Sequence, residues 1–219
     1  MNDHKERSNY ASPPCSLHEA DPAYSGILAH DPQAALEVAR WRKSERTRLI
    51  DKRLSTAAAR RTEAAANIAA KLDREIGDLR DRTIGFYWPF RGEPDLRGWA
   101  QGKLGAGARI ALPVVIAKGQ PLEFRSWKPG EKLEKGVWNI PVPAAGELVS
   151  PDIVIAPLVG FDPAGYRLGY GGGFYDRTLA AMPSKPLTIG VGFEFQRLPT
   201  IFPQWHDVPM NSLVIERVS

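Results

Sequence analysis

Nine consecutive residues, Ile153-Val-Ile-Ala-Pro-Leu-Val-Gly-Phe161, carry neither a charge nor a polar side chain. A strand with this composition has to be covered on both faces, as strands inside parallel sheets are. The run is also the longest apolar stretch, and it is far shorter than the ~20 residues of a membrane-spanning helix. The stretch therefore predicts a central strand of a parallel sheet and no membrane span.

Predicted helices and strands alternate on both sides of this run. Helices are expected over residues 33–54, 57–76, 95–100 and 174–182, and strands over 83–88, 109–115, 122–127, 187–193 and 212–216. Pro113 is expected to break the strand over 109–115, because proline cannot donate to a sheet ladder. Alternation of this kind favours a mostly parallel, three-layer α/β fold with a helical preamble at its N-terminal side.

The chain of 219 residues is long enough for one substantial core, and we expect a single domain over residues 33–219. Residues 1–32 contain several prolines among small polar residues, which predicts a disordered leader. This leader has no apolar stretch resembling a secretory signal, and Cys15 is the single cysteine. A cytoplasmic protein without an intramolecular disulfide is expected, with a monomer favoured.

Positive charge is concentrated between Arg40 and Arg61, where nine basic residues face two acidic ones. Such a run on a predicted helix indicates either an anionic ligand or simply a solvated helix face. A nucleic-acid partner is one alternative, but the arginines are not interleaved with aromatic residues and no known nucleic-acid motif is present. Nucleic-acid binding is therefore the less favoured hypothesis.

Glycines cluster after the central apolar run, in Arg167-Leu-Gly-Tyr-Gly-Gly-Gly-Phe-Tyr-Asp176. Ligands bind beyond the carboxyl ends of strands in open α/β sheets, which is where this loop is expected. Glycines let backbone N–H groups converge on an anion, and the helix that follows adds its N-terminal dipole. Arg167 could clamp a phosphate and Asp176 could hold Mg²⁺. The loop lacks the ending of a Walker A motif and lies too late in the chain for a usual dinucleotide fold.

Four ordered motifs resemble the 5-formyltetrahydrofolate cyclo-ligases, also called 5,10-methenyltetrahydrofolate synthetases. They are Gly160–Arg177, Tyr87–Asp95, Trp138–Pro143 and Trp205–Met210, and the resemblance extends over roughly residues 36–217. It implies a Rossmann-like α/β/α fold and an ATP-driven ring closure. In that reaction the formyl oxygen of 5-formyltetrahydrofolate attacks the γ-phosphate, an amine nitrogen closes on the activated carbon, and 5,10-methenyltetrahydrofolate, ADP and phosphate are formed.

The resemblance also implies roles for particular residues, with ATP and Mg²⁺ as cofactors and Arg167 and Asp176 as catalytic residues. The metal would be held by Asp176 and Asp207. The residues implied to bind ATP are Arg42, Lys43, Arg167, Leu168, Gly169, Tyr170, Gly171, Gly172, Gly173, Phe174 and Tyr175. The residues implied to bind the folate are Trp88, Glu93 and Trp138.

Some of these assignments have structural alternatives. Trp88 could be a core residue at a strand end, and Trp138 could anchor a loop. Some family members carry basic residues where this chain has Tyr170 and Gly172, and often a further acidic residue where it has Asn211. Charge neutralisation is therefore expected to depend more on Arg167 and the basic helix. A related protein that acts on another small anion also remains an alternative, because one fold supports many chemistries.

Overall fold

A computed structural model of the chain describes residues 32–218, so almost all of the predicted leader lies outside the described residues. Its centre is a six-stranded sheet in the order β10-β9-β6-β1-β2-β3, in which only β3 runs antiparallel to its neighbour. The strands are β1 (Thr83–Gly85), β2 (Arg109–Val115), β3 (Leu122–Ser126), β6 (Ile153–Pro157), β9 (Leu187–Phe193) and β10 (Ser212–Glu216). The prediction of a mostly parallel sheet is confirmed.

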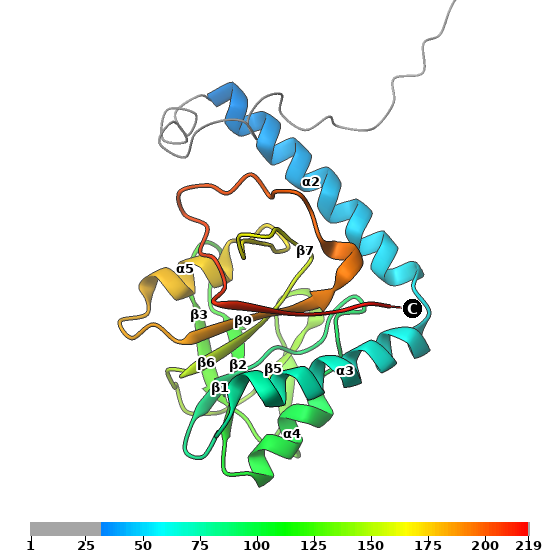
Figure 1. The fold of residues 1–219 in the computed structure, drawn as a ribbon. Coiled ribbons are helices and arrows are strands. Elements are labelled where there is room, and N and C mark those ends of the chain that lie inside the picture. Colours follow the sequence, from blue (N-terminus) through cyan, green and yellow to red (C-terminus); the bar gives the residue numbers. More distant parts are fainter. Residues whose placement is uncertain (1–31, 219) are drawn as a thin grey trace, which may run out of the picture.

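Helices cover both faces of this sheet (Figure 1). Helices α3 (Ala58–Ile76) and α4 (Arg97–Gly105) pack on one face, where Ile68 and Ala100 belong to the same core as Ile84 and Ile155. Helix α5 (Phe174–Ala181) packs on the opposite face through Leu179, which joins a core with Val154 and Phe124. The predicted three-layer arrangement is confirmed, and the second helix of the expected preamble is itself one of the layers.

The first helix, α2 (Pro32–Ser55), lies outside these layers and spans the region beyond the carboxyl ends of the strands (Figure 1). Its apolar side chains Val38, Trp41 and Leu49 form a separate core with Leu168 and the segment 198–202. The core thereby fixes one side of α2 against the part of the molecule where an α/β sheet binds its ligands.

The apolar run from Ile153 differs from the prediction, because it forms two strands instead of one. β6 ends at Pro157, and β7 (Gly160–Phe161) leaves the main sheet to pair antiparallel with β8 (Arg167–Leu168). Both halves are buried, so composition alone did not separate them. The β7–β8 hairpin carries the chain directly into the glycine loop.

The prediction that Pro113 breaks its strand is wrong. β2 continues through Pro113, which lies opposite Phe124 of β3. The carbonyl of Ala111 faces β1 and accepts a hydrogen bond from Phe86 N–H. Backbone groups two residues apart face the same side of a strand, so the nitrogen of Pro113 also faces the side of β1. It lies beyond the end of β1, where the sheet needs no hydrogen-bond donor from this strand.

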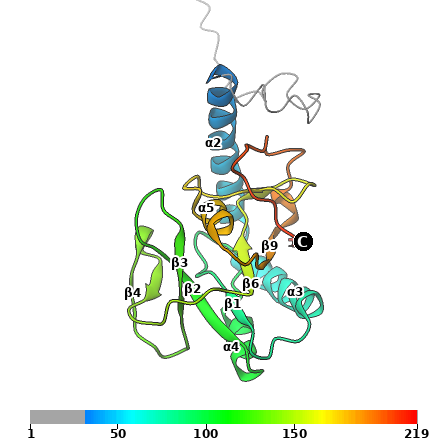
Figure 2. The same ribbon diagram turned by 90° about the vertical axis from the view of Figure 1, so that its left-hand side faces the viewer.

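Several other boundaries shift, and besides the β7–β8 hairpin four short elements were not predicted. β1 ends at Gly85 instead of residue 88, and α4 covers residues 97–105 instead of 95–100. Beside β3 the chain makes an excursion through β4 (Leu133–Lys135), the 3₁₀ turn η2 (Val137–Asn139) and β5 (Pro141–Pro143), which projects from the sheet in Figure 2. A second 3₁₀ turn, η3 (Glu194–Gln196), follows β9. Within residues 32–218, no helix has the length and apolar character needed to span a membrane.

Candidate active site

A pocket opens at the carboxyl ends of β1 and β6, where α2, the glycine loop, the η2 excursion and the segment 201–211 meet. It is lined by nearly all residues that the sequence pointed to, from both the ATP set and the folate set. They are Arg42, Trp88, Glu93, Trp138, Arg167, Leu168, Gly169, Tyr170, Gly171, Gly172, Gly173, Phe174, Tyr175, Asp176 and Asp207. The tertiary structure thus brings four separate motifs to one cavity.

The glycine loop joins β8 to the N-terminus of α5, as expected. Gly171 and Gly173 have φ angles of +95° and +63°, a region that favours glycine. A Cβ atom on Gly169 would lie 2.9 Å from Nη1 of Arg167. The glycines therefore keep the backbone at these positions accessible to a phosphate beside the helix N-terminus.

Arg46 of α2 also contacts this loop, although the sequence-based assignment did not select it. Its Nε donates a 2.7 Å hydrogen bond to the carbonyl of Gly169, and its Cζ would lie 3.3 Å from a Cβ atom on Gly171. Burial, followed by the charge of Arg42, lowers the pKa of Arg46. Arg46 therefore supplies positive charge where Tyr170 and Gly172 supply none.

Lys43, by contrast, is exposed and does not line the pocket. Neighbouring residues of a helix point about 100° apart, so Lys43 cannot share the inward face of Arg42. Arg42, Arg46, Leu49 and Arg53 follow one another at steps of four, three and four, and these steps place them on one face. That spacing is the sequence signal that could have selected Arg46.

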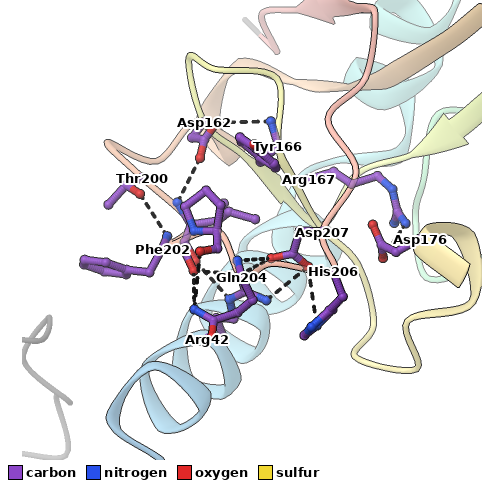
Figure 3. Close-up of polar contacts among 12 residues, drawn as sticks. Arg42, Asp162, Tyr166, Arg167, Asp176, Thr200, Phe202, Gln204, His206 and Asp207 are labelled. Atoms are coloured by element: carbon purple, nitrogen blue, oxygen red, sulfur yellow. Dashed lines mark hydrogen bonds and ion pairs between the residues drawn. The ribbon is translucent and has the colours of Figure 1, made fainter. Parts of the chain in front are cut away.

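Arg42 holds the segment 201–207 against α2 (Figure 3). Its Nε donates to the carbonyl of Ile201 at 2.9 Å, and its Nη2 donates to the carbonyl of Phe202 at 2.8 Å and to Oδ2 of Asp207 at 2.5 Å. The same segment is fixed from the other side by buried Asp162, whose Oδ2 accepts from Ile201 N–H. Arg42 therefore positions this segment in addition to lining the pocket.

Arg167 and Asp176 face each other at the start of α5 (Figure 3). Nη2 of Arg167 donates to Oδ2 of Asp176 at 2.9 Å, and Arg167 also lies over the ring of Tyr175, 4.9 Å from its centroid. Among the described residues, the buried Nε of Arg167 has no hydrogen-bond partner. Because the Arg167 side chain lines the pocket, its guanidinium is suited to pair with an anionic ligand.

The two carboxylates expected to hold a metal, Asp176 and Asp207, are each paired with an arginine. Within residues 32–218, no group of three histidine, cysteine or acidic side chains gathers as a metal site. Proteins commonly offer Mg²⁺ only one or two carboxylates, while water and substrate phosphates complete the shell. Two carboxylates on one pocket therefore fit a magnesium ion that arrives with a nucleotide.

Glu93 is 5% exposed and lines the pocket from the loop after β1. Its Oε2 accepts from Phe90 N–H at 2.9 Å, and its Oε1 accepts from the hydroxyl of Tyr170 at 3.0 Å. Burial raises the pKa of Glu93 to about 7, although Arg53 and these two hydrogen bonds act in the opposite direction. A buried carboxylate of this kind is suited to accept N–H groups of a ligand.

Aromatic side chains surround the same part of the pocket. Trp138 is half-exposed and nearly parallel to Phe90, and it lies 5.8 Å from Tyr170 between ring centroids. Trp88 packs edge-on against Trp127, so it combines the core role considered as an alternative with a place in the pocket wall. Phe90 was not selected from the sequence, although it lies inside the motif Tyr87–Asp95.

Fold and site together define an α/β protein whose glycine loop, carboxylates and aromatic side chains line one pocket at the carboxyl ends of the strands. The model of the 5-formyltetrahydrofolate cyclo-ligase family matches residues 38–216. The chain therefore belongs to that family.

Relatives and solved structures agree with this membership. The chain is 27% identical to the 5-formyltetrahydrofolate cyclo-ligase of Haemophilus influenzae over 80% of this chain and 97% of the relative. It is 32% identical to that of Escherichia coli K12 over 60% of this chain and 76% of the relative. The NMR structure of Aquifex aeolicus 5,10-methenyltetrahydrofolate synthetase superimposes with a TM-score of 0.67 at 28% identity, covering 80% of this chain and 89% of that one.

Proposed function

We propose that this chain converts 5-formyltetrahydrofolate to 5,10-methenyltetrahydrofolate, with ATP as the phosphoryl donor and ADP and phosphate as products. The observation that carries the proposal is one pocket with two chemically different ends. Among the residues that line it, we assign Arg46, Arg167 and the glycine loop to an anion-binding end, and Glu93 with its aromatic neighbours to the other. A reaction between a nucleotide phosphate and a flat heterocycle needs both ends in one cavity.

The reaction transfers the γ-phosphoryl group of ATP to the formyl oxygen. The neighbouring amine nitrogen then bonds to the formyl carbon, and phosphate leaves with the original formyl oxygen. Phosphoryl transfer depends mainly on positioning and on neutralising charge. Arg46 and Arg167, which line the pocket, would neutralise that charge, and the glycine loop would orient the phosphates.

The Mg²⁺ that accompanies ATP would supply positive charge to offset that of the phosphates. Asp176 and Asp207 are the residues that would hold it. Each carboxylate lies against an arginine, at 2.9 Å and 2.5 Å respectively. These contacts orient both carboxylates at the pocket wall.

The folate would occupy the Glu93 end. Its pterin ring offers amino and ring N–H groups, which match the acceptor oxygens of a buried carboxylate. Trp138 and Trp88 would cover the flat faces of the substrate. The ionised form of Glu93 would be stabilised by these donors, because hydrogen bonds to a carboxylate lower its pKa.

The basic run of α2 agrees with this proposal better than with a nucleic-acid partner. Arg42, Arg46 and Arg53 all point inward and make hydrogen bonds inside the protein. Arg48 pairs with Glu45 on the same helix. These three arginines of the inward face are therefore engaged inside the protein, and two of them, Arg42 and Arg46, line the pocket.

The direct test mixes the protein with Mg-ATP and 5-formyltetrahydrofolate and follows the near-ultraviolet absorbance of the methenyl product. We expect an ATP-dependent rise in absorbance and stoichiometric release of phosphate. Omitting ATP provides the control. Folded protein that gives no ATP-dependent product would overturn the proposed function.

A further inference from the structure

Arg53 is the largest fully buried side chain that carries a charge, with 0% of its surface exposed. It lies near the end of α2 on the same face as Arg42 and Arg46, but it does not line the pocket. Burying a guanidinium is costly unless its donors are paired. The groups that pair with Arg53 therefore identify the segments that this buried charge holds together.

Each nitrogen of this guanidinium binds a different segment of the chain. Nε donates to the carbonyl of Arg91 at 2.8 Å, and Nη1 donates to the carbonyl of Leu158 at 3.0 Å. Nη2 donates to the hydroxyl of Tyr170 at 2.5 Å. Arg53 thus ties together the loop after β1, the segment after β6 and the glycine loop.

Through Tyr170 the same guanidinium reaches Glu93. The Tyr170 hydroxyl accepts from Arg53 and donates to Oε1 of Glu93 at 3.0 Å, while Nη2 of Arg53 lies 4.0 Å from that oxygen. Tyr170 is therefore the link between the cation and the carboxylate. A lysine could keep the charge at position 53 but could not reproduce the planar fork of three contacts.

We propose that Arg53 is a positioning residue for the substrate end of the pocket, holding the Glu93 carboxylate and the Tyr170 side chain in the arrangement that accepts the folate. This inference rests on the proposed function. Arg53 lies behind the pocket wall, next to the Tyr170 hydroxyl and the Glu93 carboxylate. It would therefore affect recognition of the folate more than recognition of ATP. It also joins the loop that carries Glu93 to the loop that binds the nucleotide.

The groups that face Glu93 come from several elements. Tyr87 lies just after β1, Tyr170 in the glycine loop and Tyr175 in α5. Burial raises the pKa of each of these phenols, and the charge of Glu93 adds to that effect. Arg53 is the cation that lowers the pKa of Glu93 against the effect of burial. Removing Arg53 should therefore extend the protonated state of Glu93 to higher pH.

The test compares Arg53→Met, Arg53→Lys and Tyr170→Phe, with Arg48→Met on the exposed side of the same helix as the matched control. For each protein, kcat/KM for 5-formyltetrahydrofolate is measured against pH, together with ATP affinity in the absence of folate. Arg53→Met should raise KM for the folate about tenfold or more, since it removes hydrogen bonds from a charged group. ATP affinity should change less than about threefold, within the coupling expected between neighbouring sites.

The pH profile separates positioning from a merely structural role. In Arg53→Met the acidic limb of kcat/KM should move to higher pH, Tyr170→Phe should move it in the same direction by less, and Arg53→Lys should keep it near the wild-type position. If Arg53→Met does not fold, the shift of the acidic limb in Tyr170→Phe provides the test. Equal losses for ATP and folate, or an acidic limb that does not move, would overturn the inference.

The activity of the wild-type protein distinguishes a wrong role for Arg53 from a wrong proposed function. Wild-type protein that makes no methenyl product would overturn both. Active wild-type protein with unshifted variants would overturn the role of Arg53 alone.

Discussion

Replacing Glu93 by glutamine tests how much the buried negative charge of Glu93 destabilises the folded protein. The side chain is 5% exposed and accepts hydrogen bonds from Phe90 N–H and from the Tyr170 hydroxyl. Glutamine has nearly the same shape as a protonated glutamate and keeps an acceptor oxygen. The variant therefore imitates the protonated state at every pH.

The size of the effect follows from the pKa of Glu93, which burial raises from 4.5 to about 7. A group whose pKa is higher in the folded state stabilises the fold fully below its unfolded pKa. That contribution is lost as the pH rises through the folded pKa. At about 1.4 kcal/mol per pKa unit, wild type should lose about 2–3 kcal/mol relative to Glu93→Gln between pH 5 and pH 8.5.

Urea denaturation of both proteins at several pH values between 5 and 8.5 measures this difference. Glu147→Gln, which alters an exposed glutamate, controls for the general effect of removing one negative charge. We expect Glu93→Gln to gain stability relative to wild type as the pH rises, while its KM for the folate increases. A stability difference that stays constant with pH would refute the assignment of a buried, desolvated carboxylate at this position.

Three further outcomes are expected. Arg46→Met should weaken ATP binding about tenfold by removing a charge beside the glycine loop, whereas Lys43→Met should weaken it less than about twofold. Equal effects in a nucleotide-binding titration would contradict the placement of these side chains. Gly173→Ala should lower the free energy of unfolding by about 1 kcal/mol because its φ is +63°, whereas Gly102→Ala inside α4 should raise it by up to ~1 kcal/mol in the same denaturation assay. Asp176→Asn should reduce turnover at limiting Mg²⁺ at least about tenfold while the circular dichroism spectrum is retained, and unchanged turnover would show that the metal binds elsewhere.

Much of the fold could be predicted because its signals are local. Helix periodicity and the apolar run at 153–161 predicted the layers, the central strand and the ends of β9 and β10. The excursion through β4 and β5 was missed because its strands are three residues long and only partly buried, so they carry little hydrophobic pattern. Pro113 was misjudged because its effect depends on where the neighbouring strand ends.

The sequence by itself determined the family, the sheet with its glycine loop, and most of the side chains that line the pocket. These features follow from ordered motifs and from periodicity among residues that are close together in the sequence. Only the tertiary structure decided how those side chains pair. Arg46 contacts Gly169 across 123 positions and Arg53 contacts Tyr170 across 117, and no local pattern encodes such distances. Those long-range contacts depend on the face that α2 turns toward the sheet, which is fixed by packing of Trp41 and Leu49 into a core built from distant segments.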